Sequence, residues 1–152
     1  MTTLKYSEAI KAPAEKVYRT MLGLDDSKTY EAWTFEFNPT SKVRGTWEKD
    51  SKMHFVGMDE NGKEGGMVSL IADHVPAKFV SIKHIGILDG TTEITTGPMV
   101  EQWAGSFENY SFEENDGKTT VHVTIDMVDD HMEYFNETWP KALKKLKELC
   151  EE

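Results

Sequence analysis

The chain has 152 residues, of which 38% are hydrophobic and 29% are charged. This composition is typical of a folded globular domain and excludes a disordered or collagen-like chain. The formal net charge of −10 disfavours nucleic acid or an anionic membrane surface as the main partner, because both repel an acidic protein.

The cysteine content bears on the compartment. Cys150 is the only cysteine, so no internal disulfide can form and a reducing compartment, the cytoplasm, is expected. The first residues lack the apolar core of a signal peptide. No apolar run approaches the roughly 18 residues that a membrane-spanning helix needs.

The first third of the chain predicts a strand followed by two short helices. Residues 4–11 alternate between apolar and polar side chains, which indicates a strand. Pro13 suits the first turn of a helix, and Gly23 can end that helix in a left-handed conformation. Residues 27–33 predict the second helix. The apolar stripe of the first helix is Val17, Tyr18, Met21 and Leu22.

The middle of the chain predicts an antiparallel sheet, because tight-turn signals separate its β-rich segments. These signals are Asn61-Gly62, Asp89-Gly90 and Asp116-Gly117, and Pro76 marks a further break. Strands are expected around Met53 and Phe55 and over residues 67–75, 79–87, 103–113 and 119–128.

The last segment predicts a long amphipathic helix. Asp129 or Asp130 can cap its start, and lysines follow in its second half, where they complement the helix dipole. Pro140 removes one backbone hydrogen bond, so we expect a kink or a restart there. The apolar positions are Met132, Phe135, Trp139, Ala142, Leu143, Leu146 and Leu149.

Together these elements predict one α+β domain over residues 1–152, with the order β-α-α-β-β-β-β-β-α. One face of the antiparallel sheet must be covered, and the C-terminal helix is the element long and apolar enough to cover it. A strongly curved sheet and a helix do not close completely, so an apolar cavity is expected between them.

Four segments resemble the START-like, or SRPBCC, superfamily. Residues 10–17, IKAPAEKV, resemble the entry to its first helix. Three further segments resemble one branch, the domain homologous to the C-terminal part of the activator of the heat-shock protein 90 ATPase. They are residues 33–47 (WTFEFNPTSKVRGTW), 103–112 (WAGSFENYSF) and 139–147 (WPKALKKLK).

The resemblance implies a helix-grip fold, in which a curved antiparallel sheet wraps around a long C-terminal helix. Members of the superfamily commonly hold lipids, polyketides or other apolar ligands between sheet and helix, and a minority are enzymes such as aromatase/cyclases. The eukaryotic activator also carries a separate N-terminal chaperone-binding domain, for which 152 residues leave no room.

The candidate cavity residues are apolar or aromatic side chains on the expected inward faces, together with His84. Methionines among them suit an adaptable wall. For any one of these side chains, ordinary core packing is the simpler interpretation. The set is Trp33, Phe35, Met53, Phe55, Met67, Ile82, His84, Trp103, Met127, Phe135, Trp139 and Leu143.

Groups for catalysis are sparse. His84 could act as an acid or base near neutral pH, although a structural histidine is the simpler interpretation. Glu108 and Tyr110 share one face of their strand, and Glu101 lies near its start, but no spacing fixes a second group beside them. The five histidines form no metal-binding motif, and no cofactor is indicated. Cys150 has acidic neighbours, which disfavour a thiolate.

Three functions stay open. The first is the binding of a small hydrophobic molecule in the cavity. The second is a protein-interaction module that activates a chaperone ATPase. The third is a cyclase or hydrolase that uses the same cavity, and it requires a histidine or carboxylate facing that space.

Overall fold

A computed structural model describes residues 2–128 and 131–152. Its helices are α1 (Ala14–Leu22), α2 (Ser27–Thr34), α3 (Pro98–Glu101) and α4 (Met132–Glu151). Its strands are β1 (Thr2–Ile10), β2 (Lys42–Gly45), β3 (Lys52–Met58), β4 (Glu64–Val75), β5 (Phe79–Asp89), β6 (Thr92–Ile94), β7 (Phe107–Asn115) and β8 (Lys118–Met127).

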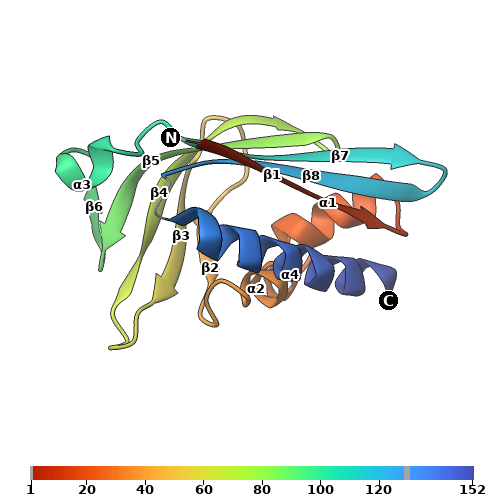
Figure 1. Ribbon diagram of the computed structural model, residues 1–152, viewed down its shortest axis with the longest axis horizontal. Helices are drawn as coiled ribbons and strands as arrows, with labels where there is room; N and C mark the ends of the chain where they lie inside the picture. Colours follow the sequence, from red (N-terminus) through yellow and green to blue (C-terminus); the bar gives the residue numbers. More distant parts are fainter. Residues whose placement is uncertain (1, 129–130) are drawn as a thin grey trace.

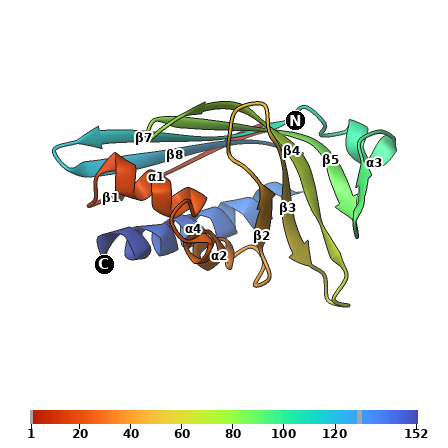
Figure 2. The same cartoon turned by 180° about the vertical axis from the view of Figure 1, so that it is seen from behind.

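The strands form one antiparallel sheet in the order β1-β8-β7-β5-β4-β3-β2, and β6 pairs with β5 beside this path. The sheet bends so that β2, β3 and β4 turn down past one end of α4 (Figure 1). From behind, α1 and α2 lie on the same side of the sheet as α4 (Figure 2). This arrangement confirms the expected α+β helix-grip fold.

Turn chemistry sets the pairing of the strands. Asp116 and Gly117 both have positive φ, 53° and 78°, as the tight turn between β7 and β8 requires. Gly62 closes the β3–β4 hairpin in the same way with φ 77°. β4 ends at Val75, directly before Pro76, because proline cannot donate to a strand ladder.

The two early helices form where the pattern places them. Gly23 ends α1 with φ 67° and a left-handed conformation, and the four predicted apolar residues of α1 are buried. Asp26 begins α2, because its side chain accepts a hydrogen bond from the Lys28 backbone N–H at 3.0 Å. Such a cap satisfies a donor that the helix itself leaves unpaired.

Helix α4 is a single element from Met132 to Glu151, so the restart expected at Pro140 does not occur. Pro140 and Asn136 are both exposed, and the Asn136 carbonyl left without its helical donor can therefore be hydrated. The capping proposed for Asp129 or Asp130 lies outside the described residues. His131 precedes the helix and makes no side-chain cap.

Three short elements were not predicted. β2 presents mostly exposed residues, and β6 and α3 have only three and four residues, which is too short for a periodic signal. The strand expected from residue 103 begins at Phe107, because Trp103 and Ala104 lie in the turn that follows α3. None of the helices in the described part of the chain combines the length and hydropathy needed to cross a bilayer.

A candidate ligand pocket between the sheet and the C-terminal helix

A pocket of about 830 Å³ lies between the inner face of the sheet and the first half of α4. Its walls come from α2, β3, β4, β5, β7, β8 and α4, and the loop after α3 adds one side. At this end β3 and β4 turn down past the start of α4 (Figure 1), and the pocket lies between them and the helix. The opposite end is filled by the buried helical residues Ala142, Leu143 and Leu146.

The structure brings most of the predicted cavity residues together. Those that line the pocket are Trp33, Phe55, Met67, His84, Trp103, Met127, Phe135 and Trp139. Contact of these side chains with a ligand stays a prediction.

Four predicted cavity residues lie elsewhere. Met53, Ile82 and Leu143 face inward but are 1% exposed within the packed core, so the pocket does not reach them. Phe35 follows the last residue of α2 and is 56% exposed. Its backbone is still helical, and its N–H donates to the Glu31 carbonyl at 3.0 Å. Its ring therefore lies above Glu31 and outside the buried stripe of α2.

Aromatic rings form most of the wall, and they pack against one another. The Trp139 ring centre lies 5.6 Å from that of Trp33 and 5.0 Å from that of Phe37. Phe37 in turn contacts Phe135 at 6.0 Å. Edge-to-face and tilted contacts of this kind stabilise each ring position, so the wall is largely preformed.

Two tryptophans differ in how their N–H groups are satisfied. Trp33 Nε1 donates to the Met21 carbonyl at 2.8 Å. That carbonyl belongs to the last turn of α1 and lacks a helical partner, so Trp33 ties α2 to α1. Trp139 Nε1 is buried and has no hydrogen-bond partner among the described residues.

A chain of polar groups crosses one wall of the pocket. His84 Nδ1 lies 2.7 Å from Ser69 Oγ on the paired strand β4, and His84 Nε2 lies 3.3 Å from Glu108 Oε1 on β7. The Tyr110 hydroxyl donates to Glu108 Oε2. The neutral His84 tautomer with its proton on Nε2 satisfies this chain: Ser69 donates to Nδ1, and Nε2–H donates to Glu108.

The strand geometry explains why these groups meet. Glu108 and Tyr110 are two residues apart on β7 and therefore share the inner face. Ile82 pairs with Glu108, and Ser69 pairs with His84 after a register shift that skips Ile85 of β5. That irregularity, which no sequence signal marks, aligns Ser69 with the imidazole.

The buried phenols stay protonated. Burial raises the pKa of Tyr30 and that of Tyr110 above the usual range, and the nearby negative charge of Glu108 raises both pKa values further. The two side chains are therefore hydrogen-bond donors at neutral pH.

Ser69, His84 and Glu108 are not arranged as a hydrolytic triad that could act on a ligand in the pocket. Ser69 is fully buried and does not line the pocket, so its hydroxyl cannot reach a bound substrate. Ser69 orients the imidazole, while His84, Glu108 and Tyr110 face the pocket. In the part of the chain that the structure describes, no three His, Cys, Asp or Glu side chains gather as metal ligands.

Sequence patterns missed several lining residues in loops and at helix ends. Phe37 follows α2 and Tyr134 lies in the first turn of α4, and neither belongs to an apolar period. Tyr134 OH donates to the Phe37 carbonyl at 3.1 Å, which joins the two segments at the pocket rim. Others that were missed include Thr34, Ser41, Gln102 and Ser106, together with Tyr30 within α2 and Ile87 within β5.

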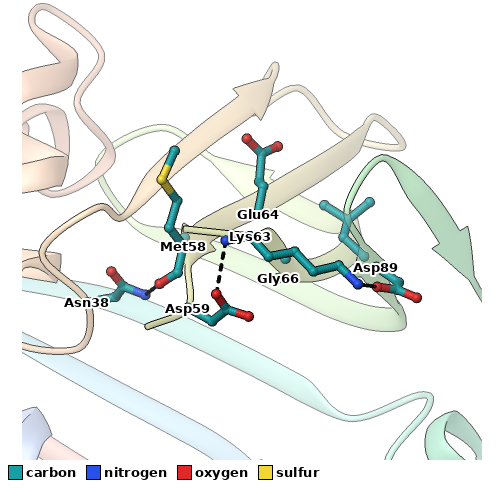
Figure 3. A pocket seen from close by; sticks show the side chains of 10 residues that line it. Asn38, Met58, Asp59, Lys63, Glu64, Gly66 and Asp89 are labelled. Atoms are coloured by element: carbon teal, nitrogen blue, oxygen red, sulfur yellow. Dashed lines mark hydrogen bonds and ion pairs between the residues drawn. The ribbon is translucent and has the colours of Figure 1, made fainter. Parts of the chain in front are cut away.

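A second hollow of about 400 Å³ lies at the β3–β4 hairpin. Its polar groups serve the hairpin itself: Lys63 pairs with Asp89, and the Lys63 backbone N–H donates to Asp59 at 2.9 Å (Figure 3). Asn38 Nδ2 donates to the Met58 carbonyl at 3.0 Å. We therefore assign this hollow to turn structure.

Comparison with known proteins agrees with the fold and the site geometry. The sequence model of the family described as "Activator of Hsp90 ATPase homolog 1-like protein" matches residues 11–151. The chain belongs to this family. The expected branch of the SRPBCC superfamily is thereby confirmed.

Solved structures share the fold of this family member. The solution structure of the Aha1 dimer from Colwellia psychrerythraea is 23% identical, with a TM-score of 0.70, and the match covers 99% of this chain and 97% of that one. A crystal structure of a Nitrosomonas europaea protein is 16% identical, with a TM-score of 0.71 and coverage of 97% and 92%. A Mesorhizobium loti protein is 15% identical, with a TM-score of 0.67 and coverage of 97% and 96%. The search of curated proteins found no match.

Proposed function

We propose that this family member binds a small hydrophobic molecule in the pocket between the sheet and α4, with residues 1–152 acting as one START-like domain. The observation that carries the proposal is the aromatic-walled volume of about 830 Å³. This volume lies within the range of about 300–1,000 Å³ that is typical of small-molecule sites.

The burial of apolar surface is the main source of binding free energy for a ligand in this pocket. A ligand that buries about 300 Å² of apolar surface gains about 7 kcal/mol before the cost of immobilising it. Because neighbouring rings already hold the wall in place, ordering it on binding costs little. Since a Kd of 1 µM needs about 8.2 kcal/mol of net binding free energy and 1 mM about 4.1 kcal/mol, such a ligand should bind in the range of tens of micromolar to millimolar without a charged anchor.

The test combines native mass spectrometry for a co-purifying ligand with thermal melts against a panel of neutral aromatic and lipid compounds. At a concentration of about 100 Kd, a ligand stabilises the fold by about 2.7 kcal/mol. A panel that leaves the melting temperature unchanged at saturation, with no ligand co-purifying, would refute the proposal.

A matched pair of variants locates the site. Trp103→Ala removes a half-buried ring from the pocket rim, and Phe35→Ala removes an exposed ring outside it. Binding at the pocket predicts that Trp103→Ala weakens the affinity about tenfold, while Phe35→Ala leaves it unchanged. Equal effects of the two variants would place the ligand elsewhere.

A second candidate function is interaction with a chaperone of the heat-shock protein 90 class. It is supported by membership of the activator family and by the exposed Phe35 ring, which the fold does not use. Purified chaperone with the chain in stoichiometric excess should show a raised ATPase rate, and Phe35→Ala should reduce it. No stimulation would end this candidate.

The third candidate, a cyclase or hydrolase, is supported by His84 and Glu108 in the pocket wall. It predicts turnover that His84→Gln abolishes while ligand affinity remains. A cytoplasmic location is part of the main proposal, and it is supported by the single cysteine, whose thiol is free.

A further inference from the structure

The polar side of the pocket carries a negative charge. The Glu108 carboxylate accepts hydrogen bonds from the Tyr110 hydroxyl and from His84 Nε2, and its side chain is 20% exposed. At a pH where His84 is neutral, its imidazole donates to Glu108 without cancelling the negative charge. None of the described residues that line the pocket is a lysine or an arginine.

Asp126 adds no second inward charge, although part of it lines the pocket. It follows the inward-facing Ile125, so strand alternation turns its side chain to the outer face. Its carboxylate there accepts bonds from Thr3 Oγ1 at 2.8 Å and from the Phe107 backbone N–H at 3.0 Å. The inward anion is therefore Glu108.

Aromatic rings line the same pocket as Glu108. Tyr110 and Trp139 lie with ring centres 6.2 Å apart, and Tyr110 and Trp33 lie 6.4 Å apart. The faces of such rings attract ammonium groups, most strongly where water is excluded. A ligand carboxylate in the same place would meet Glu108 with no lysine or arginine of the lining to compensate it.

We infer that the pocket selects apolar ligands that carry a positive charge, namely hydrophobic amines and quaternary ammonium compounds, over neutral and anionic ligands of the same shape. This inference rests on the proposed ligand-binding function and specifies its substrate class. The net charge of −10 acts in the same direction, because it raises the local concentration of cations.

The test uses three matched probes at about pH 8, where free imidazoles are neutral. They are phenylbutyl-trimethylammonium, its neutral isostere with carbon in place of the ammonium nitrogen, and a phenylalkyl carboxylate of equal length. Titration calorimetry measures the affinities, and quenching of the tryptophans in the pocket wall reports binding at the site.

The ammonium probe should bind at least about tenfold more tightly than the neutral isostere. The carboxylate should bind more weakly than either of them. Glu108→Gln should remove most of the preference for the cation while the affinity for the neutral isostere is retained, which also shows that the variant is folded. Glu113→Gln is the control, because Glu113 lies on the same strand but is exposed, and it should preserve the preference.

The outcomes separate the inference from the proposed function. Equal binding of the ammonium and neutral probes, or tightest binding of the carboxylate, overturns the charge selection and leaves the ligand site in place. A preference that survives Glu108→Gln as fully as Glu113→Gln also overturns it. If none of the three probes binds, the charge selection fails, and so does the proposed binding of small hydrophobic molecules in the pocket.

Discussion

At the scale of single residues, the pocket wall depends on side chains whose partners come from other elements. Trp33 donates to the last turn of α1, and Ser69 holds the ring of His84. Trp139 has no such partner in the part of the chain that the structure describes. Residues of the same type, equally buried, therefore contribute differently to stability.

The two buried tryptophans allow a direct comparison. Trp33→Phe leaves the Met21 carbonyl without its donor, whereas Trp139→Phe removes an N–H that has no partner. Because a buried group that loses its hydrogen bond costs about 1–3 kcal/mol, Trp33→Phe should lower the free energy of unfolding by about 1–2 kcal/mol more than Trp139→Phe does. Urea denaturation measures both, and a larger loss for Trp139→Phe would contradict this account.

Cys150 should be chemically inert in the folded chain. It is 1% exposed, and burial raises the pKa of its thiol from 9.0 to about 11. Two pKa units reduce the thiolate fraction about 100-fold, so iodoacetamide at about pH 8 should modify the native chain at least 100-fold more slowly than the urea-unfolded chain. Mass spectrometry of timed samples reads the rates, and similar rates would show that the C-terminal turn of α4 is open.

The same raised pKa sets a direction for stability. The unfolded thiol loses its proton near pH 9 while the folded thiol keeps it to about pH 11. The unfolded state then binds fewer protons, so the contribution of Cys150 is complete below pH 9 and decreases as the pH rises to about 11. Cys150→Ala should make the melting temperature less sensitive to pH in this window.

At the scale of elements, the close approach of β3 and β4 depends on one glycine. Gly66 has φ 152°, and a Cβ atom there would lie 1.9 Å from the Phe55 carbonyl oxygen. Phe55 belongs to the pocket wall. The hairpin that opens the pocket end of the sheet therefore cannot accept a side chain at this point without separating its strands.

Gly66→Ala should destabilise the fold by about 2–4 kcal/mol, because the added methyl group meets backbone atoms that cannot move aside. Gly62→Ala is the matched control: Gly62 also has positive φ, but a Cβ there meets nothing within 4 Å. In Gly62→Ala, backbone strain alone should lower the free energy of unfolding by about 1–2 kcal/mol. Thermal or urea unfolding compares the variants, and equal losses would show that the steric contact relaxes.

At the scale of the whole molecule, the charge of −10 is spread over a surface with few strong ion pairs. Pairs such as Arg19–Asp25 and Lys63–Asp89 are largely exposed, and exposed pairs contribute little. Repulsion among the excess carboxylates should therefore outweigh them and destabilise the folded state.

Salt should then stabilise the protein. Raising NaCl from about 0.01 M to about 0.2 M shortens the screening length from about 30 Å to below 10 Å, and the melting temperature should rise by about 2–4 °C. Differential scanning calorimetry measures the change. The rise should disappear at the pH where the net charge is zero, and a fall in melting temperature with salt would show that ion pairs dominate.

The sequence alone predicted the α+β class, the two early helices, the hairpins and the inward stripe of α4. These features follow from local physics, namely apolar periods of two and 3.6 residues and glycines at positive φ, whereas the helix-grip fold was implied by the resemblance of four segments to the SRPBCC superfamily. The same periods identified side chains that face inward. They could not separate pocket from packed core, as Met53 and Ile82 show, because both kinds of residue occupy the same face of a strand.

Only the tertiary structure decided where the pocket opens and which polar groups line it. The Ser69–His84–Glu108 chain needs a register shift at Ile85 of β5 and the pairing of three strands, and Phe37 meets Tyr134 from 97 residues away. Such contacts arise from the curvature of the sheet and the docking of α4. The curvature and the docking result from many small interactions between distant parts of the chain, so no short segment of the sequence determines them.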